Sequence, residues 1–382
     1  MKRSERLIKL LLPAICCVIC CGRKEEVQTL NWTLNLKDSL AIPVNNETNV
    51  QASVQLIRLG EREWLSSYQY IQGVNRFYWY SLEGDTLNRV ITIPAEGPGG
   101  TGRLSPVMGI VKENDLLVYQ VNANRFYITD TTGGVKQRFD LADKVASTIL
   151  STHYFLPGVV NNKLRFFVLG SYHPNSREFL ERSKAEGMYD LITGHYSNTQ
   201  PRYPDYPRGY ELSLENWKVS RCVNGLGITV YTFPFDSHLH VYDTLGRHML
   251  IKVPNPDRPE RVNRKITDPM NQEEQFAFLA TTGLYSHILY DQFRKIYFRI
   301  FLMPCPAVLS DGTTRRPADF PWRLEIFNGD FELKGVVYFE SGKYNPYQLL
   351  VSQRGLLISK VNPYRPNQED FLKYDVYAIA PI

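Results

Sequence analysis

Two histidines have a spacing that could hold a metal ion in this chain of 382 residues. His238 and His240 lie two positions apart in the segment Ser237–His240, which reads SHLH. If this segment is a strand, both imidazoles point to the same side of the sheet and could grip one ion. No third ligand stands nearby in the sequence, so the alternative is a pair that faces solvent or a channel. We predict no metal and keep His238 and His240 as candidate ligand-binding residues.

The segment Gly97–Gly102 reads GPGGTG and satisfies the G-x-G-x-x-G pattern of dinucleotide-binding loops. In those loops the pyrophosphate rests on the N-terminus of the helix that follows. Here Arg103–Val111 follows, contains Pro106, and reads as a strand. We therefore predict a turn that uses the freedom of glycine at positive φ, with no nucleotide and no other cofactor.

Catalytic machinery is not recognisable elsewhere in the sequence. The chain has no G-x-S-x-G nucleophile elbow. Carboxylates are plentiful, and the distance between two of them in space decides whether they could act as a glycosidase pair. The sequence does not give that distance. We predict no catalytic residue, and an enzyme remains the alternative reading.

Arg299 is a charged residue in the otherwise apolar and aromatic segment Ile296–Leu302. A buried guanidinium needs a partner, so Arg299 either lines a channel or pairs with Asp291 and stabilises a sheet. We predict the structural role. The loops also carry aromatic rings whose faces suit sugars or protein partners, unless they pack beneath their own loops. These loop aromatics are Tyr203, Tyr206, Tyr210, Phe320, Trp322, Tyr344, Tyr347 and Tyr364, with Tyr206, Trp322 and Tyr347 as the chosen candidates.

Four of the six cysteines lie close to the start of the chain, in the segment Ala14–Glu26. Four Lys or Arg residues precede an apolar run from Leu10 to Cys21. This run is shorter than the roughly 20 apolar residues that span a bilayer, and it fits a secretion signal. Within it, Val18–Cys21 resembles the site at which lipoprotein signals are cut. We predict lipid attachment at Cys21, with a plain cleaved signal as the alternative.

Cleavage before Cys21 removes four positive charges and one negative charge, so the formal net charge falls from +5 to +2. The remaining body has no block of Lys and Arg, and we predict no nucleic-acid partner. Its two other cysteines, Cys222 and Cys305, either pair or remain buried thiols. The predicted parts are a signal peptide at 1–20, a tether at 21–29 and one domain at 30–382.

The candidate residues need a scaffold, and from Leu30 onward the dominant pattern is the short strand. Apolar or alternating runs end at Gly, Pro, Asn or Asp, as strands do, and the aromatic share of 13% favours sheet. One helix is predicted at Asn271–Thr281, because acidic residues occupy its first turn and Gly283 ends it. A second, weaker helix is predicted at Asn175–Glu186.

The strands recur as a pattern in which a strand, a polar turn and a returning strand follow one another. Five copies carry turn glycines at Gly84, Gly133, Gly194, Gly246 and Gly329. This spacing is near the period of about 40–50 residues of propeller blades. We predict an all-β fold, a β-propeller of six blades with one short inserted helix, and a β-sandwich is the alternative. An early strand, within Leu30–Leu36 or Val50–Leu59, is expected to pair with the last blade and close the ring.

Two segments resemble a known family. Leu279–Phe301 (LATTGLYSHILYDQFRKIYFRIF) and Glu96–Val107 (EGPGGTGRLSPV) resemble segments of propeller-like lipoproteins of unknown function from Bacteroides-type bacteria, the domain of unknown function 4221. With the signal and the repeat, the resemblance covers essentially the whole chain. It implies a six-bladed propeller and an outer-membrane lipoprotein, and it implies no activity. Arg23–Glu26 resembles a surface-export signal of such bacteria, with a solvated tether as the alternative.

The sequence thus predicts a lipid-anchored binding or scaffold protein of the cell envelope. Its expected partners are the membrane, through the lipid, and an envelope protein or a glycan. The alternative is a hydrolase or lyase that acts on a glycan or peptide at the mouth of the channel. A carboxylate pair at glycosidase separation, or three converging metal ligands, would favour the enzyme.

Overall fold

The computed structural model describes most of the chain from Leu30 onward. The described residues are 30–48, 54–84, 87–112, 114–145, 148–150, 154–170, 172–173, 176–206, 213, 215, 217–257, 266–268, 270–361 and 370–381. The predicted signal peptide, the tether, the lipid-attachment residue Cys21 and the aromatic residues Tyr210 and Tyr364 lie outside them.

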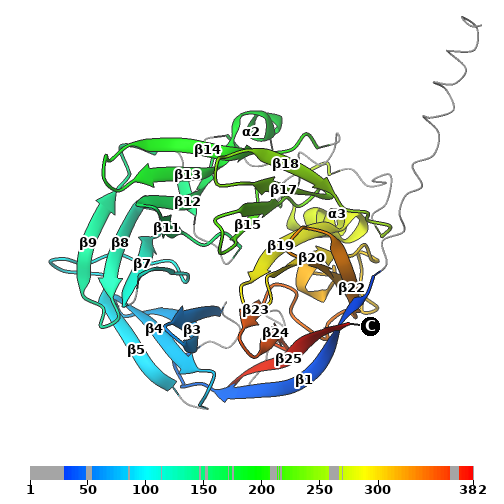
Figure 1. Cartoon of the computed structure of the whole chain (residues 1–382), viewed down its shortest axis with the longest axis horizontal. Coiled ribbons are helices and arrows are strands. Elements are labelled where there is room, and N and C mark those ends of the chain that lie inside the picture. The colour runs from blue at the N-terminus through cyan, green and yellow to red at the C-terminus, as the bar shows by residue number, and fades with distance from the viewer. Residues whose placement is uncertain are drawn as a thin grey trace, which may run out of the picture.

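Six antiparallel sheets stand around a common centre, as Figure 1 shows, and the predicted six-bladed β-propeller is confirmed. Blades 1 and 2 contain β2 (Gln55–Leu59), β3 (Arg62–Ile71), β4 (Val74–Ser81), β5 (Leu87–Pro94), β6 (Gly109–Lys112), β7 (Asp115–Gln120), β8 (Arg125–Asp130) and β9 (Val135–Asp140). Blades 3 and 4 contain β10 (Thr148–Leu150), β11 (Gly158–Val160), β12 (Lys163–Leu169), β13 (Lys184–Asp190), β14 (Tyr196–Arg202), β15 (Ser220–Val223), β16 (Thr229–Thr232), β17 (His238–Tyr242) and β18 (His248–Lys252). Blades 5 and 6 contain β19 (Leu284–Asp291), β20 (Ile296–Leu302), β21 (Trp322–Phe327), β22 (Leu333–Phe339), β23 (Leu349–Ser352), β24 (Gly355–Ser359), β25 (Phe371–Pro381) and β1 (Trp32–Pro43).

The position of a strand within its blade explains its sequence pattern. The middle strands β20 and β21 are buried at every residue, so they read as continuous apolar runs. The outer strand β9 (VKQRFD) is exposed at all but one residue and is mostly polar. Large side chains fill the space between neighbouring blades, where Phe77 and Trp79 of blade 1 meet Leu116 of blade 2. The core is therefore distributed around the ring.

The ring closes through β1, which is the outermost strand of blade 6 and pairs with β25 from Trp32 opposite Pro381 to Pro43 opposite Phe371. Closure by the first of the two predicted segments, Leu30–Leu36, is thus confirmed, whereas the second leads into blade 1. A buried carboxylate supports the joint: Asp375 of β25 accepts hydrogen bonds from the hydroxyls of Ser39 and Tyr344, each at 2.6 Å. Burial raises the pKa of Asp375, but these hydrogen bonds outweigh it and leave the pKa below its ordinary value.

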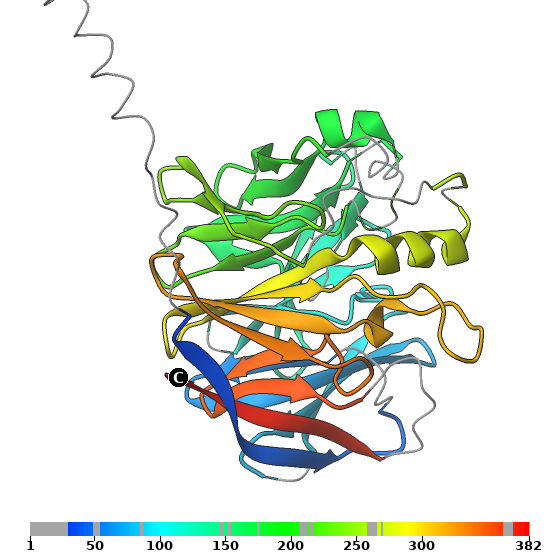
Figure 2. The ribbon, with the colours of Figure 1, turned by 90° about the vertical axis from the view of Figure 1, so that its right-hand side faces the viewer.

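Two helices project from one side of the ring, which we name the helix face, shown in Figure 2 by green α2 and yellow α3. The predicted main helix is confirmed as α3 (Gln272–Thr282), capped by the Asn271 side chain and ended by Gly283 at φ +70°. The weaker helix is α2 (Arg177–Arg182), which is shorter than predicted because β13 begins at Lys184. The paired ends of β1 and β25, Trp32 and Pro381, lie on the opposite side, which we name the turn face (Figure 2).

Two smaller predictions concern local chemistry. Gly97, Gly99 and Gly102 all have positive φ, and the next regular element is the strand β6, so GPGGTG is a turn as predicted. Cys222 and Cys305 are free and half-buried thiols, so they do not pair with each other.

Candidate functional site

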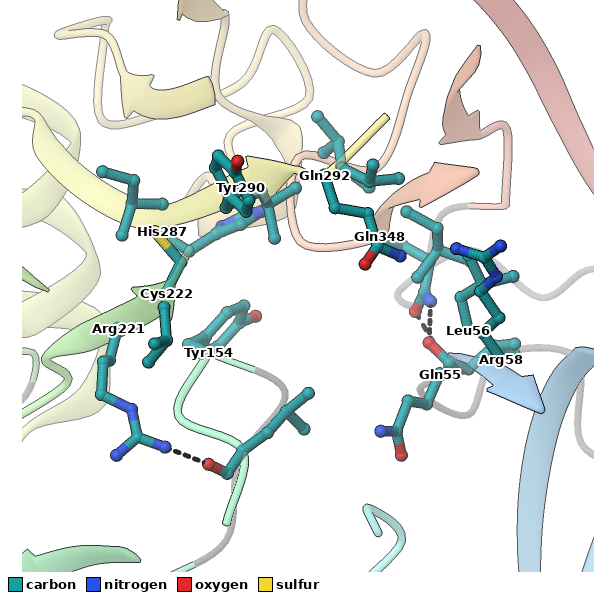
Figure 3. Close-up of a pocket in the computed structure, with 18 of the residues that line it drawn as sticks. Gln55, Leu56, Arg58, Tyr154, Arg221, Cys222, His287, Tyr290, Gln292 and Gln348 are labelled. Carbon is teal, nitrogen blue, oxygen red and sulfur yellow. Dashed lines mark hydrogen bonds between the residues drawn. The ribbon is translucent and has the colours of Figure 1, made fainter. Parts of the chain in front are cut away.

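A cavity of about 440 Å³ lies at the centre of the ring, framed by the innermost strands of blades 1, 4, 5 and 6 (Figure 3). The segment Tyr154–Leu156, which precedes β11, forms another part of its wall. Its volume is in the range of small-molecule sites, about 300–1,000 Å³. The side chains that can contact a ligand include Arg58, Tyr154, Arg221, His287, Tyr290, Gln292 and Tyr347.

Arg221 of β15 is positioned by a buried ion-pair cluster behind the cavity wall. Its Nη1 donates to Oε1 of Glu186 at 3.0 Å, and its Nη2 donates to the carbonyl of Leu156. Glu186 is fully buried and also accepts hydrogen bonds from Arg165 and from the phenol of Tyr231. We name Arg165, Glu186, Arg221 and Tyr231 the Glu186 cluster. Burial lowers the pKa of Arg221, Glu186 opposes this effect, and Arg165 lowers it further.

Arg58 of β2 lies across the opening from Arg221 in Figure 3. Its Nε donates to the carbonyl of Gly60 at 3.1 Å, and its guanidinium lies 5.0 Å from the ring centroid of Phe293. Both contacts lie at the end of the cavity wall nearest the turn face. They hold the side chain in place while it stays half-buried.

Two glutamines in the cavity wall join neighbouring segments. The amide of Gln55 donates to the carbonyl of Met108 at 2.7 Å and accepts from its N–H at 2.9 Å. The amide of Gln348 makes the same pair of hydrogen bonds with the backbone of Val54. Each amide uses both its donor and its acceptor side in this way, so these residues hold the frame of the cavity together.

Aromatic rings form one wall of the cavity. The ring of Tyr154 lies 5.0 Å from that of His287 and 6.2 Å from that of Tyr347, measured between centroids. Tyr290 adds a further ring from β19. Such rings provide flat faces against which a ligand can stack.

Among the described lining residues, Glu63 is the one carboxylate. Its two oxygens accept hydrogen bonds from the Ser352 hydroxyl at 2.6 Å and from the Gln353 N–H at 3.0 and 3.1 Å. In the part of the chain that the structure describes, no group of three or more His, Cys, Asp or Glu residues could hold a metal. The described cavity therefore contains hydrogen-bond donors, two guanidiniums and aromatic faces, without a pair of carboxylates.

Comparison with known proteins identifies the family of the chain. The family described as "Domain of unknown function (DUF4221)" matches residues 28–333. The chain belongs to the DUF4221 family. Its sequence resemblance to that family is thereby confirmed. Among curated proteins none matches.

Two solved structures resemble this DUF4221 chain over nearly its whole length. A DUF4221 member from Bacteroides vulgatus is 19% identical, with a TM-score of 0.76, and the match covers 93% of this chain and 100% of that one. A candidate exported protein from Bacteroides fragilis is 10% identical, with a TM-score of 0.50, and the match covers 94% and 98%. At these identities the likeness shows the fold alone.

The two candidate histidines of this DUF4221 chain both contact one carboxylate. Nδ1 of His238 lies 2.6 Å from Oδ1 of Asp236, and Nε2 of His240 lies 2.8 Å from Oδ2. Burial raises the pKa of Asp236, but the hydrogen bonds from both histidines outweigh it and hold the pKa well below its ordinary value. The two side chains do converge, as the spacing predicted, yet they do so around Asp236 and away from the central cavity.

Arg299 is fully buried in β20 and its partner differs from the predicted Asp291. Its Nε donates to Glu325 at 2.7 Å, and its guanidinium lies 3.9 Å from the ring centroid of Tyr285. Asp291 instead pairs with Arg294 at 2.7 Å. A facing strand supplied the partner because β20 and β21 place Arg299 opposite Glu325 in register.

Of the two readings of the loop aromatics, packing beneath their own loops holds for most of those that the structure describes. Trp322 is fully buried and stacks on Phe339 at 3.9 Å, while Tyr206 is buried against Phe235. The other described rings that are buried are Tyr203, Phe320 and Tyr344. Tyr347 alone among the described candidates lies in the wall of the central cavity. The loops fold over the ends of the blades, so their rings extend the core.

Several cavity residues were not identified from the sequence. Arg221 stands in the short strand SRCV, and Glu186 stands in a segment predicted to be helical. The argument that singled out Arg299, a charge within a long apolar strand, does not reach Arg221, because its strand is short and includes a serine. Nothing in the sequence indicates that Arg58, Tyr154 and Arg221 converge, because they belong to different blades.

Proposed function

We propose that this protein is an exported, lipid-anchored β-propeller of the cell envelope that binds a small ligand in its central cavity. The observation that carries the proposal is the cavity of about 440 Å³, with guanidinium, phenol and amide groups on a rigid frame of inner strands. Export is supported by the signal-like N-terminus and by the candidate exported protein with the same fold. A scaffold role for an envelope partner is compatible with the same anchor.

Binding is favoured over catalysis by the chemistry of the described lining. Glu63 already accepts hydrogen bonds from Ser352 and Gln353, and acid catalysis of glycoside hydrolysis needs two carboxylates at about 5–10 Å. The thiol of Cys222 is a poor nucleophile, because burial raises its pKa. The groups that remain are suited to holding a ligand.

The position of the chain start sets an orientation for the proposed anchor. Trp32 lies on the turn face and is 11 residues beyond Cys21. An extended segment of that length reaches roughly 40 Å. A lipid on Cys21 would therefore direct the turn face toward the membrane and the helix face away from it. Among the described residues no helix is long and apolar enough to cross a bilayer.

Replacing Cys21 by serine is expected to release the protein from the membrane or leave its precursor uncut. The sulfur of Cys21 is the atom that would carry the lipid, and the hydroxyl of serine does not replace it. Fractionation of cells labelled with a fatty acid measures both effects, and Cys20→Ser serves as the matched control that keeps its label. Label on the Cys21→Ser protein would show that the lipid is attached elsewhere or that the anchor is a different one.

Filling the cavity is expected to abolish ligand binding without unfolding the ring. Val351 of β23 lines the cavity, and Val351→Trp places a large ring in that space. Native mass spectrometry of protein purified from its own membranes should show a bound small molecule on the unaltered protein and none on this variant. The control Val135→Trp alters an exposed residue of β9 and should keep the molecule. An unaltered protein that carries nothing, or a Val351→Trp protein that still carries the molecule, would contradict the proposal.

A further inference from the structure

We infer that the ligand of the central cavity carries an oxyanion, a carboxylate or a phosphate, which pairs with the guanidinium of Arg58 opposite the positive charge of Arg221. The inference rests on the proposed binding function and specifies the chemistry of the same site. Ligands of either kind would be compact anions that also contain a ring. Carboxylate and phosphate are the groups that a planar guanidinium binds through two parallel hydrogen bonds.

The first argument is the balance of charge at the described site. Arg58 and Arg221 line the cavity, and Arg165 stands behind Arg221 in the Glu186 cluster. Two carboxylates, Glu63 and Glu186, oppose these three guanidiniums. The site therefore holds one positive charge in excess, and a cleft with one sign of charge in excess attracts a ligand of the opposite charge.

The second argument is that the carboxylates are already occupied. Glu63 accepts hydrogen bonds from Ser352 and from the backbone of Gln353, and it ties blade 1 to blade 6. Glu186 is fully buried and is shared by Arg165, Arg221 and Tyr231. Neither carboxylate can therefore turn toward Arg58 without leaving buried donors unsatisfied, which is costly.

The third argument is the unused donor capacity of the two arginines. A guanidinium has five N–H groups. Among the described residues, Arg58 uses one of its N–H groups in a hydrogen bond, and Arg221 uses two. Burial lowers the pKa of Arg221, and the neighbouring Arg165 lowers it further, so a nearby anion would favour the charged guanidinium. An incoming anion would stabilise both side chains.

The aromatic wall gives the remaining part of the ligand a shape. Tyr154, Tyr290 and Tyr347 line the cavity, which suits a ring with an apolar face, such as a sugar, rather than an extended chain. The volume of about 440 Å³ admits one or two rings of that size. A sugar acid and a sugar phosphate both meet these requirements, and the experiment distinguishes them.

The test compares three probes of the same ring: glucuronate, glucose 6-phosphate and neutral glucose. Isothermal titration calorimetry and thermal unfolding with millimolar probe are measured on the full mature protein at two salt concentrations. We expect at least one anionic probe to bind more tightly than glucose, by about tenfold or more. Its affinity should fall at high salt, because salt screens the attraction between the anion and the guanidinium. Preference for glucuronate indicates a carboxylate ligand, and preference for glucose 6-phosphate indicates a phosphate ligand.

Substitution of Arg58 provides the specific control. Arg58→Gln is expected to weaken the anionic probe about tenfold or more, because it removes a charge-assisted pair worth about 1.5–3 kcal/mol. The matched variant Arg62→Gln alters an exposed arginine of β3 outside the cavity and should bind as the unaltered protein does. Arg58 is half-buried with one local hydrogen bond, so unchanged thermal unfolding in the absence of probe should accompany the loss of affinity.

The inference is overturned if neither anion binds, if glucose binds as tightly as both anions, or if Arg58→Gln leaves anion affinity unchanged. These results are separable from failure of the proposed function. A small molecule that is retained by the unaltered protein and lost by Val351→Trp would then show a binding cavity with a ligand of different chemistry.

Discussion

Replacement of Glu186 by glutamine is expected to lower the free energy of unfolding by about 3–5 kcal/mol, because it removes the buried charge that Arg165 and Arg221 share. Glu186 is fully buried, and it accepts hydrogen bonds from Arg165, Arg221 and Tyr231. Glutamine has nearly the same shape, so the loss is electrostatic rather than a loss of packing. It leaves two guanidiniums close together with no counter-charge between them.

Chemical denaturation of the unaltered protein and of Glu186→Gln measures this difference. The control is Glu181→Gln on α2, where the carboxylate is exposed and pairs with Arg177 at 3.0 Å. Exposed pairs of this kind contribute about 1 kcal/mol or less, so the control should unfold close to the unaltered protein. If Glu186→Gln were as stable as Glu181→Gln, water or backbone groups would compensate the charges of Arg165 and Arg221. Glu186 would then not organise the cavity wall.

The Glu186 cluster also connects two hollows. Arg221 lines the central cavity, while Arg165 and Tyr231 line a groove of about 370 Å³ between blades 3 and 4. Because one carboxylate holds both arginines, a change at Arg165 is expected to alter the position of Arg221. The residue that supports the cavity wall thus lies at the junction of two blades.

The fold was largely predictable because blade strands carry strong local patterns. Ile296–Leu302 was identified with the observed bounds of β20, because it reads as an apolar and aromatic run between a polar turn and a proline, and all seven of its residues are buried. The helix α3 was also predicted, from an acidic first turn and a terminal Gly283. Both features are local, so they are visible in the sequence alone.

The cavity was much less predictable because its residues are brought together by closure of the ring. Arg58, Tyr154, Arg221 and Tyr347 belong to distant parts of the chain, and β15 has only four residues with little periodicity. The end of α2 was misplaced for a related reason. Residues from Lys184 to Glu186, which were predicted to be helical, belong to β13, and Gly187 of the same strand lies where an added Cβ would come within 2.6 Å of the Phe166 ring. That close approach is a tertiary requirement.

The loop aromatics show how tertiary packing changes the meaning of a residue type. Proline-rich loops with tyrosine and tryptophan look like exposed binding rims in sequence. In the structure Trp322 stacks on Phe339 and Phe339 meets Tyr344 edge-on, so these rings complete the core between blades 5 and 6. Burial of this apolar area stabilises the ring more than its exposure to a ligand would.

Ile42→Asp is expected to open the ring and to lower the free energy of unfolding by at least about 4 kcal/mol. Ile42 of β1 is almost fully buried where blade 6 meets blade 1, among Leu65, Tyr78 and Leu372. The substitution removes about 1.5–3 kcal/mol of apolar burial, and burial of an unpaired carboxylate adds a further cost. Because β1 is the fourth strand of blade 6, its release would also expose the edge of β25.

The same strand supplies a matched control for the closure. Leu36→Asp introduces the same charge at a leucine that is 59% exposed, and it should change stability by about 0.5 kcal/mol or less. Denaturation gives the two stabilities, and amide hydrogen exchange shows whether β25 loses protection in the Ile42→Asp protein, as an opened edge requires. Full protection of β25 together with unaltered stability would mean that blades 6 and 1 hold the ring closed without β1. The cavity would then not depend on this strand, because its frame from β2 and β23 is already joined by the hydrogen bonds of Gln348 with Val54. If protection is lost, that joint alone is too weak, and closure by β1 is what keeps the cavity wall in place.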